Sequence, residues 1–213
     1  MTTKAQINDL ITQLHTIYPD AHCELHYETP IQLLVATILS AQCTDERVNQ
    51  VTASLFQKYK TAVDFAAANR EELEQAIRPA GFFRRKAKHI QEASHIIVHQ
   101  HGGGMPNTME ELLALPGVAR KTANVVLGEI FQIADGITVD THVKRLSKKL
   151  GLTQADDPKK VEQDLMRIIP HSEWLNISHL LIFHGRQICH ARRPKGPVCP
   201  LNDSCPSAEV DAS

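Results

Sequence analysis

Lys121 has the surroundings that a nucleophile or a phosphate contact needs. It lies in Leu112–Leu127, LLALPGVARKTANVVL, where one helix is expected to end near Leu115 and a second to begin near Arg120. The first backbone N–H groups of a helix have no partner within it, so they form a natural seat for a phosphate. A lysine in this turn opposes the helix dipole by about 0.3–1 kcal/mol, which favours the uncharged amine that acts as a nucleophile. A lysine that only contacts phosphate is the simpler alternative.

The two expected helices are joined by a tight turn at Pro116-Gly117. Helices joined in this way form a helix-hairpin-helix, which holds the DNA backbone without reading its sequence. A hairpin with only a packing role is the alternative. The Leu-Pro-Gly-Val turn followed by Lys-Thr-Ala favours the DNA-binding interpretation.

Asp140 is a candidate chemical partner for Lys121. It lies in Val139–His142, VDTH, at the expected start of a helix. An isolated aspartate at such a position most often serves only as a helix N-cap. A carboxylate beside Lys121 would also act as a general base and stabilise positive charge. Sequence alone does not place the two side chains together.

The five cysteines divide into two isolated residues and a group of three near the C-terminus. Cys23 and Cys43 are expected to be small buried residues, whereas Cys189, Cys199 and Cys205 are close in sequence. An odd count without a secretory signal argues against a disulfide framework. The group of three therefore indicates a metal site as the first possibility.

Composition and charge distribution narrow the class of protein. Hydrophobic residues make up 42% of the chain and charged residues 22%, as in an ordinary soluble protein. No apolar run approaches the roughly 20 residues that span a bilayer, and no secretory signal is recognisable, so we expect a cytoplasmic protein. The net charge is only −1, but basic residues gather in Arg84–Lys88, Lys144–Lys149 and Arg186–Lys195. Each cluster alone is most often a solvated helix face; the three together favour a polyanionic partner.

The apolar spacing is helical nearly throughout, and no segment alternates as a strand does. Helix starts are indicated by Thr29-Pro30, Asn69, Thr108 and Asp157-Pro158, and the first is expected to form a capping box with Gln32. We expect an all-α fold of roughly ten short helices, without an internal repeat or a flexible linker.

Four motifs together are similar to those of the endonuclease III family of helix-hairpin-helix DNA glycosylases. They are Leu39–Asp45 (LSAQCTD), the hairpin Leu115–Val126, Val139–His142 and His184–Arg186 (HGR). The resemblance implies two compact helical domains with a DNA cleft between them. A six-helix bundle, residues 29–134, would carry the hairpin. The N-terminal helix, residues 1–28, would join residues 135–213, which contain the cysteine-rich loop (Cys189–Cys205).

The resemblance also implies a bifunctional glycosylase and abasic-site lyase of base excision repair. Such an enzyme removes oxidised pyrimidines from duplex DNA after flipping the nucleotide out of the stack. Lys121 would attack the sugar C1′ and form a Schiff base, and β-elimination would then break the strand. Asp140 would accept the lysine's proton and stabilise positive charge on the sugar. The expected partner is duplex DNA with a damaged pyrimidine or an abasic site, bound by a monomer.

Further DNA-binding roles follow from the same resemblance. Gln42 matches a residue that fills the space left by the flipped nucleotide. Phe82 matches an apolar wedge that enters the stack, with core packing as its alternative. Ser40 and His142 are further cleft residues. The backbone clamp comprises Pro116, Gly117, Val118, Ala119 and Arg120. Ala119 stands where the family usually has a glycine, which is tolerable if the backbone angle there is helical.

The family holds a four-iron four-sulfur (4Fe-4S) cluster with four cysteines that have six, two and five residues between them. Cys189, Cys199 and Cys205 match three of these positions, but Gly196 stands at the second. Such clusters ordinarily need four thiolates. The alternatives are a cluster with one non-protein or histidine ligand (His190 is nearest in sequence), a three-iron cluster, or no cluster. Zinc fits less well, because three cysteines lack clear zinc-finger spacing.

Two other functions stay open at this point. An adenine-specific mismatch glycosylase of the same superfamily lacks the hairpin lysine and uses an early glutamate, yet the corresponding stretch Leu34–Leu39 contains no acid. A non-catalytic helix-hairpin-helix module would keep only the clamp. The presence of both Lys121 and Asp140 argues against such a module.

Overall fold

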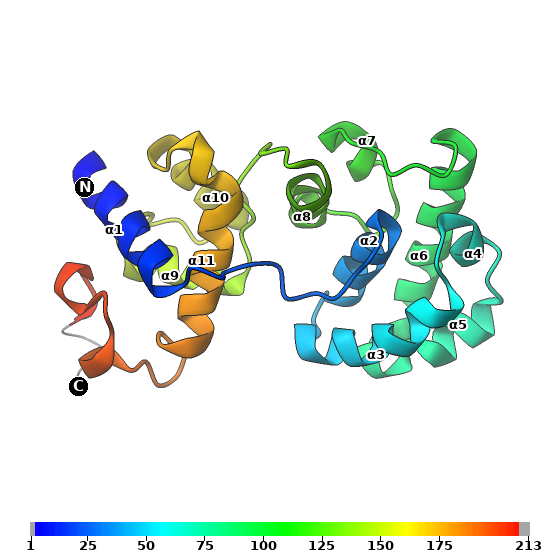
Figure 1. Cartoon of the computed structure of the whole chain (residues 1–213), viewed down its shortest axis with the longest axis horizontal. Helices are drawn as coiled ribbons and strands as arrows, with labels where there is room; N and C mark the ends of the chain where they lie inside the picture. The colour runs from blue at the N-terminus through cyan, green and yellow to red at the C-terminus, as the bar shows by residue number, and fades with distance from the viewer. Residues whose placement is uncertain (1–2, 209–213) are drawn as a thin grey trace. The chain divides into compact units, whose positions relative to one another are not determined.

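The computed structural model describes residues 3–208. Within that range the chain forms eleven α-helices and four short 3-10 helices, and no strand (Figure 1). The all-α fold expected from the sequence is confirmed. None of the described helices combines the length and apolar character that crossing a membrane requires.

The chain divides into two compact units. The central unit is Glu24–Ile133, and the terminal unit combines Met1–Cys23 with Ala134–Ser213. The resemblance implies boundaries after residues 28 and 134, whereas this division falls after 23 and 133. The segment before Thr29 belongs with the central unit because it is tied to Asn49: His26 N donates to Asn49 Oδ1 at 2.9 Å, and Asn49 Nδ2 donates to Glu24 O at 2.8 Å.

The central unit is built around two helices, one apolar on all sides and one amphipathic. Its helices are α2 (Pro30–Leu39), α3 (Asp45–Lys58), α4 (Ala62–Ala66), α5 (Arg70–Ala76), the 3-10 helix η1 (Arg78–Ala80), α6 (Phe83–Gln100), α7 (Met109–Leu113) and α8 (Arg120–Phe131). Helix α2 is buried from Ile31 to Leu39, as a helix that is apolar on all sides must be. Helix α6 is amphipathic and packs on α2, α4 and α5.

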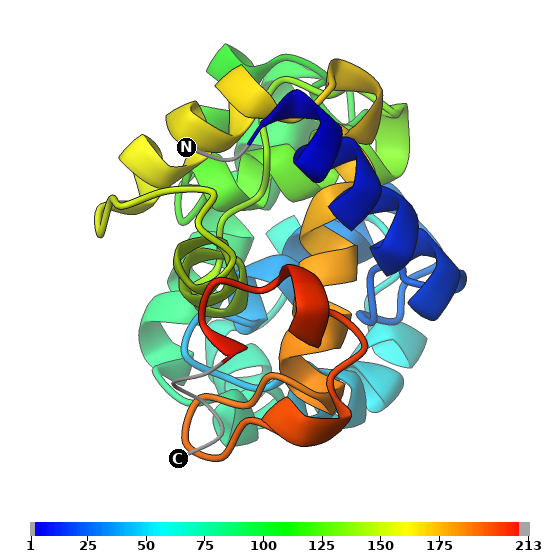
Figure 2. The same cartoon turned by 90° about the vertical axis from the view of Figure 1, so that its left-hand side faces the viewer.

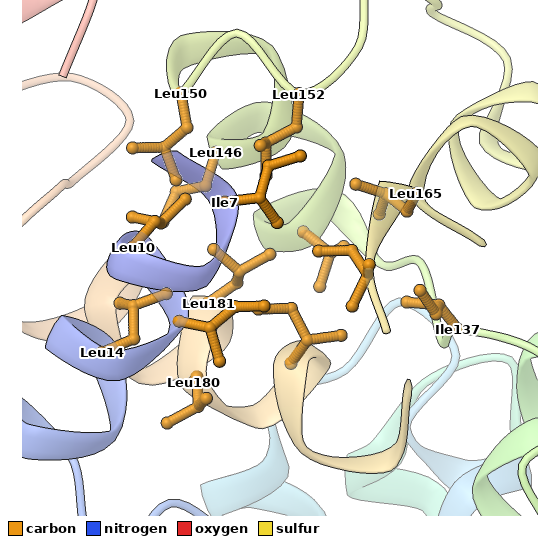
Figure 3. Close-up of a cluster of buried hydrophobic side chains, with 14 of the residues drawn as sticks. Ile7, Leu10, Leu14, Ile137, Leu146, Leu150, Leu152, Leu165, Leu180 and Leu181 are labelled. Carbon is orange, nitrogen blue, oxygen red and sulfur yellow. The ribbon is translucent and has the colours of Figure 1, made fainter. Parts of the chain in front are cut away.

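The terminal unit joins the two ends of the chain. Its helices are α1 (Lys4–Ile17), α9 (Thr141–Lys149), α10 (Pro158–Ile168), the 3-10 helix η2 (His171–Glu173), α11 (Trp174–Gln187) and the 3-10 helices η3 (Gly196–Val198) and η4 (Asn202–Ser204). Helix α11 packs on both α1 and α9, and Figure 2 shows α1 beside it. Figure 3 shows the core that results, where Leu14, Leu146, Leu165 and Leu181 meet from four helices.

Local capping signals set the helix starts. Thr29, Asn69, Thr108 and Asp157 each cap the helix predicted to follow them. The capping box expected at Thr29 forms only in part. The Thr29 hydroxyl accepts from Gln32 N, but Gln32 Oε1 accepts from the backbone N–H of Glu28 at 2.7 Å and does not return to Thr29. The Gln32 side chain thereby ties the incoming chain to the helix.

Candidate active site

The hairpin expected around Lys121 is present in the central unit. Helix α7 ends at Leu113, and α8 begins at Arg120. Between them Val118 N donates to Leu115 O at 3.1 Å, and both side chains are buried. Gly117 has φ +79°, and a Cβ there would lie 2.7 Å from the Cβ of His89 on α6. Only glycine satisfies both the left-handed backbone and this close approach.

The N-terminus of α8 has no side-chain cap. Ala119 occupies the N-cap position with φ −103° and ψ 171°, and no side-chain hydrogen bond closes the helix end. The tolerance for alanine expected from the sequence assumes a helical backbone angle, and the observed angle at Ala119 is extended instead. An extended backbone is equally open to any L-residue, so alanine is still tolerated. The first N–H groups of α8 therefore keep the character of an anion-binding end.

Lys121 lies in the first turn of α8 and is exposed. Its ammonium makes no ion pair or hydrogen bond with any residue in the described range. The neighbouring Thr122, Ala123 and Asn124 are buried, so they fix the turn from which Lys121 projects. An exposed amine without a protein partner is available to a ligand.

Asp140 lies in the terminal unit and caps α9. Its Oδ1 accepts a hydrogen bond from Val143 N at 2.8 Å, and the side chain is half-buried. Its Oδ2 has no partner among the residues that the structure describes. Nearby, His142 Nδ1 lies 3.2 Å from Arg145 Nη2. Asp140 and Lys121 belong to different units, and their pairing stays a prediction.

Gln42 and Phe82 share an unusual backbone conformation in the central unit. Both are exposed and both are left-handed, with φ +55° and +48°. Phe82 is 66% exposed, so the core-packing alternative for it is wrong. Ser40, at the end of α2, is half-buried, and its hydroxyl donates to Thr37 O at 2.9 Å. The exposed side chains of Gln42 and Phe82 thus both project from left-handed turns.

The basic run at the start of α6 needs one correction. Arg84, Arg85 and Lys88 are exposed, as a solvated or DNA-facing cluster requires. Lys86 is instead 4% exposed. Its ammonium donates to the backbone carbonyls of Leu39 and Ala80, both at 2.8 Å. Sequence reasoning missed this residue, although Lys86, Ile90, Ala93 and Ile97 follow one helical stripe, all buried.

The three C-terminal cysteines line one small cavity in the terminal unit. Cys189, Cys199 and Cys205 are half-buried there, beside Gly196 and the buried His184. The cavity measures about 20 Å³, room for about one water molecule.

Cys199 faces a buried pair of hydrogen-bonded rings. Burial raises the pKa of Tyr18 to about 12, and burial lowers the pKa of His184 to about 4, so both are neutral at pH 7. The Tyr18 hydroxyl and His184 Nδ1 share a hydrogen bond of 2.9 Å, and His184 Nε2 lies 3.7 Å from Cys199 Sγ. Cys205 Sγ lies 3.9 Å from Lys149 O. These two sulfurs already have protein partners.

The donor set does not fit a complete four-cysteine cluster. Position 196 offers no thiolate, so three of the four family positions carry a cysteine. Nowhere in residues 3–208 do three or more His, Cys, Asp or Glu side chains gather closely enough to hold a single metal ion. The three cysteines are nevertheless present on one cavity.

Comparisons with known proteins identify the family of this chain. Residues 35–171 match the model of the HhH-GPD superfamily of base excision DNA repair proteins. The chain is 56% identical to an endonuclease III of Synechocystis sp., over 97% of this chain and 94% of that protein. It is 46% identical to an endonuclease III of Bacillus subtilis, over 96% of this chain and 94% of that protein.

A solved structure is also similar. It is a trapped covalent intermediate of an endonuclease III with DNA, in an estranged-adenine complex. That structure superposes with a TM-score of 0.94 at 46% identity and covers 100% of both chains. The chain therefore belongs to the endonuclease III family, within the helix-hairpin-helix superfamily of base excision DNA repair proteins.

Proposed function

We propose that this protein is a bifunctional DNA glycosylase and abasic-site lyase that removes oxidised pyrimidines from duplex DNA. The observation that carries the proposal is Lys121, an exposed amine without a protein partner on a helix end that suits a phosphate. A pure DNA clamp does not need such a residue. A role in repair of the chromosome also supports a cytoplasmic location.

Lys121 is the nucleophile in this proposal. Its uncharged nitrogen bonds to the sugar C1′ while the bond from C1′ to the base breaks, and the base leaves with the electron pair and takes up a proton. Ring opening gives a Schiff base. Loss of a proton from C2′ then expels the 3′ phosphate and cuts the strand. Asp140 accepts the proton from the lysine and stabilises positive charge on the sugar through Oδ2, which its capping bond leaves open.

The other assigned residues hold the DNA. The N–H groups of the hairpin segment Pro116–Arg120 bind backbone phosphate. Gln42 fills the space of the flipped nucleotide, and Phe82 enters the stack as a wedge. The exposure of both side chains supports these roles. Ser40 and His142 are further DNA-contacting residues in this proposal.

The cysteine-rich loop keeps its shape without a complete 4Fe-4S cluster in this proposal. Arg145 Nη1 donates to Cys189 O at 2.7 Å, and Ser207 Oγ donates to Lys149 O at 2.9 Å. Leu201 is buried in the core of the terminal unit. These contacts support a loop held by packing and hydrogen bonds, so the basic side chains of the loop remain available for phosphate.

Trapping of the intermediate tests the central claim. Borohydride reduces a Schiff base, so wild-type protein mixed with duplex DNA containing an oxidised pyrimidine should form a stable protein–DNA adduct. Lys121→Gln should abolish the adduct while DNA binding persists. Lys60→Gln, at an exposed lysine of the same unit with no assigned role, should trap as wild type does.

The same assay separates the alternatives. A non-catalytic module leaves the strand intact, and an adenine-specific glycosylase releases adenine without cutting. An undiminished adduct in Lys121→Gln contradicts the assignment of the nucleophile.

A further inference from the structure

Left-handed backbone is rare at residues other than glycine, and it persists where the surrounding structure enforces it. Within residues 3–208 it occurs at Gln42, Phe82 and Gln132. Gln132 is an ordinary left-handed C-cap of α8. Gln42 and Phe82 lie in connections, the first after α2 and the second before α6. Something must hold these two turns in place.

Lys86 contacts the element before each turn. Its Nζ donates to Leu39 O, on the last residue of α2, three positions before Gln42. It also donates to Ala80 O, on the last residue of η1, two positions before Phe82. Leu39 and Ala80 are themselves buried, so both acceptors are fixed in the core. One ammonium group thus bridges the two segments.

The two carbonyl acceptors favour a positively charged side chain over an apolar one. Carbonyl groups at the end of a helix lack intrahelical donors and attract a cation. Burial lowers the pKa of Lys86, and the nearby Cys43 acts against that effect. A buried charge is costly unless it is well hydrogen-bonded, and an apolar side chain of similar length would fill the same space without that cost. Packing alone therefore does not account for a lysine here.

We propose that Lys86 is a positioning residue that fixes the Gln42 turn and the Phe82 turn relative to each other. The two exposed side chains then meet the DNA as one preset pair, with Gln42 filling the vacated space while Phe82 wedges the stack. This inference rests on the proposed function. It places Lys86 behind the DNA-contacting surface and not in contact with the nucleic acid.

Lys86→Met tests the proposal, because methionine is similar in length and lacks the charge and the donors. The probe is a duplex with a stable abasic analogue and 2-aminopurine opposite it, whose fluorescence rises when the base unstacks. We expect Lys86→Met to lose most of that rise and about tenfold or more in affinity for this duplex. Affinity for undamaged duplex should stay within about twofold, since the exposed basic side chains remain. Lys86→Arg should recover part of both signals, and Lys60→Met should behave as wild type.

Strand cutting separates positioning from a merely structural role. Lys86→Met should cut a single-stranded abasic oligonucleotide as wild type does, because no stack has to open, and should cut the duplex about tenfold more slowly. A folded Lys86→Met with normal fluorescence rise and duplex cutting overturns the proposal. Equal losses on both substrates overturn it as well, because they indicate general damage to the protein.

A second measurement keeps the proposal testable if Lys86→Met does not fold. Gln42→Ala, Phe82→Ala and the double variant form a cycle on the fluorescence rise. A preset pair predicts that each single variant loses most of the rise and that the double variant loses little more. Independent, additive losses overturn the proposal. If the wild-type protein neither forms the trapped adduct nor cuts DNA, the proposed function is wrong. That result differs from the outcomes that overturn the Lys86 proposal, since those require an active wild-type protein.

Discussion

Asp140 uses only one of its carboxylate oxygens in the fold, and this division lets its structural and chemical roles be separated. Oδ1 accepts from Val143 N and closes the start of α9. Asparagine retains such an acceptor and ranks with aspartate as an N-cap, but it carries no negative charge. A substitution at this one atom therefore leaves the helix start intact and removes the group proposed to act in catalysis.

Asp140→Asn is expected to lower the single-turnover rate of base release by roughly 10²–10⁴-fold, the scale of a positioned acid or base. Its melting temperature should stay near that of wild type, because the cap survives. Asp140→Ala is the matched comparison: it should lose the same rate and also about 0.5–2 kcal/mol of stability. An unchanged rate in Asp140→Asn would mean that the residue is only a cap.

At the scale of elements, the sequence predicts best what is determined locally. Thr29, Asn69, Thr108 and Asp157 cap the predicted helices because a capping side chain bonds its own helix two or three residues on. The hairpin turn at Gly117 was predictable for the same reason, although its contact with His89 was not.

The role of Lys86 could not be predicted in this way. Its neighbours form a charged run, and only packing of α6 against the ends of α2 and η1 turns this one lysine inward. Likewise, the sequence predicts that Asp140 caps a helix but does not predict which of its carboxylate oxygens stays open to a ligand. The helical stripe that contains Lys86 was visible in the sequence, but it predicts burial and not the partners.

The C-terminal loop offers a test at the same scale. Gly196→Cys restores the fourth cysteine of the family spacing, and a complete thiolate set favours a 4Fe-4S cluster. Wild-type protein purified in air should contain sub-stoichiometric iron, whereas Gly196→Cys should approach about four irons and four sulfides per chain. Iron and sulfide analysis with visible absorption measures this, and Gly196→Ala controls for the loss of glycine.

Either of two results would change the interpretation of this loop. A full, air-stable complement of iron in the wild type would mean that another ligand completes the site. An iron-free Gly196→Cys would mean that a fourth cysteine does not restore a cluster site, because the packing around His184 and Cys199 holds the loop in a form that excludes the metal.

For the whole molecule, the question is how a chain of net charge −1 attracts a polyanion. Part of its positive charge is committed to the fold: Arg145 donates to Cys189 O, and Lys148 pairs with Asp156 at 2.7 Å. Other basic side chains are exposed, among them Arg192 and Arg193 of the cysteine-rich loop. Attraction to DNA therefore depends on where the exposed charges lie and not on their sum.

This distribution predicts binding to undamaged duplex that weakens linearly in log affinity against log salt, with a slope of about −0.9 for each phosphate contacted. Replacing both Arg192 and Arg193 by Ala should make the slope shallower by up to about 2 units, because two phosphate contacts are lost. Replacing Lys159 and Lys160, which are exposed at the start of α10, removes the same charge from another place and should leave the slope within about half a unit of wild type. Fluorescence anisotropy across a salt series measures all three proteins. Equal changes in the two double variants would show that affinity follows net charge alone, and a flat salt response in wild type would contradict electrostatic binding altogether.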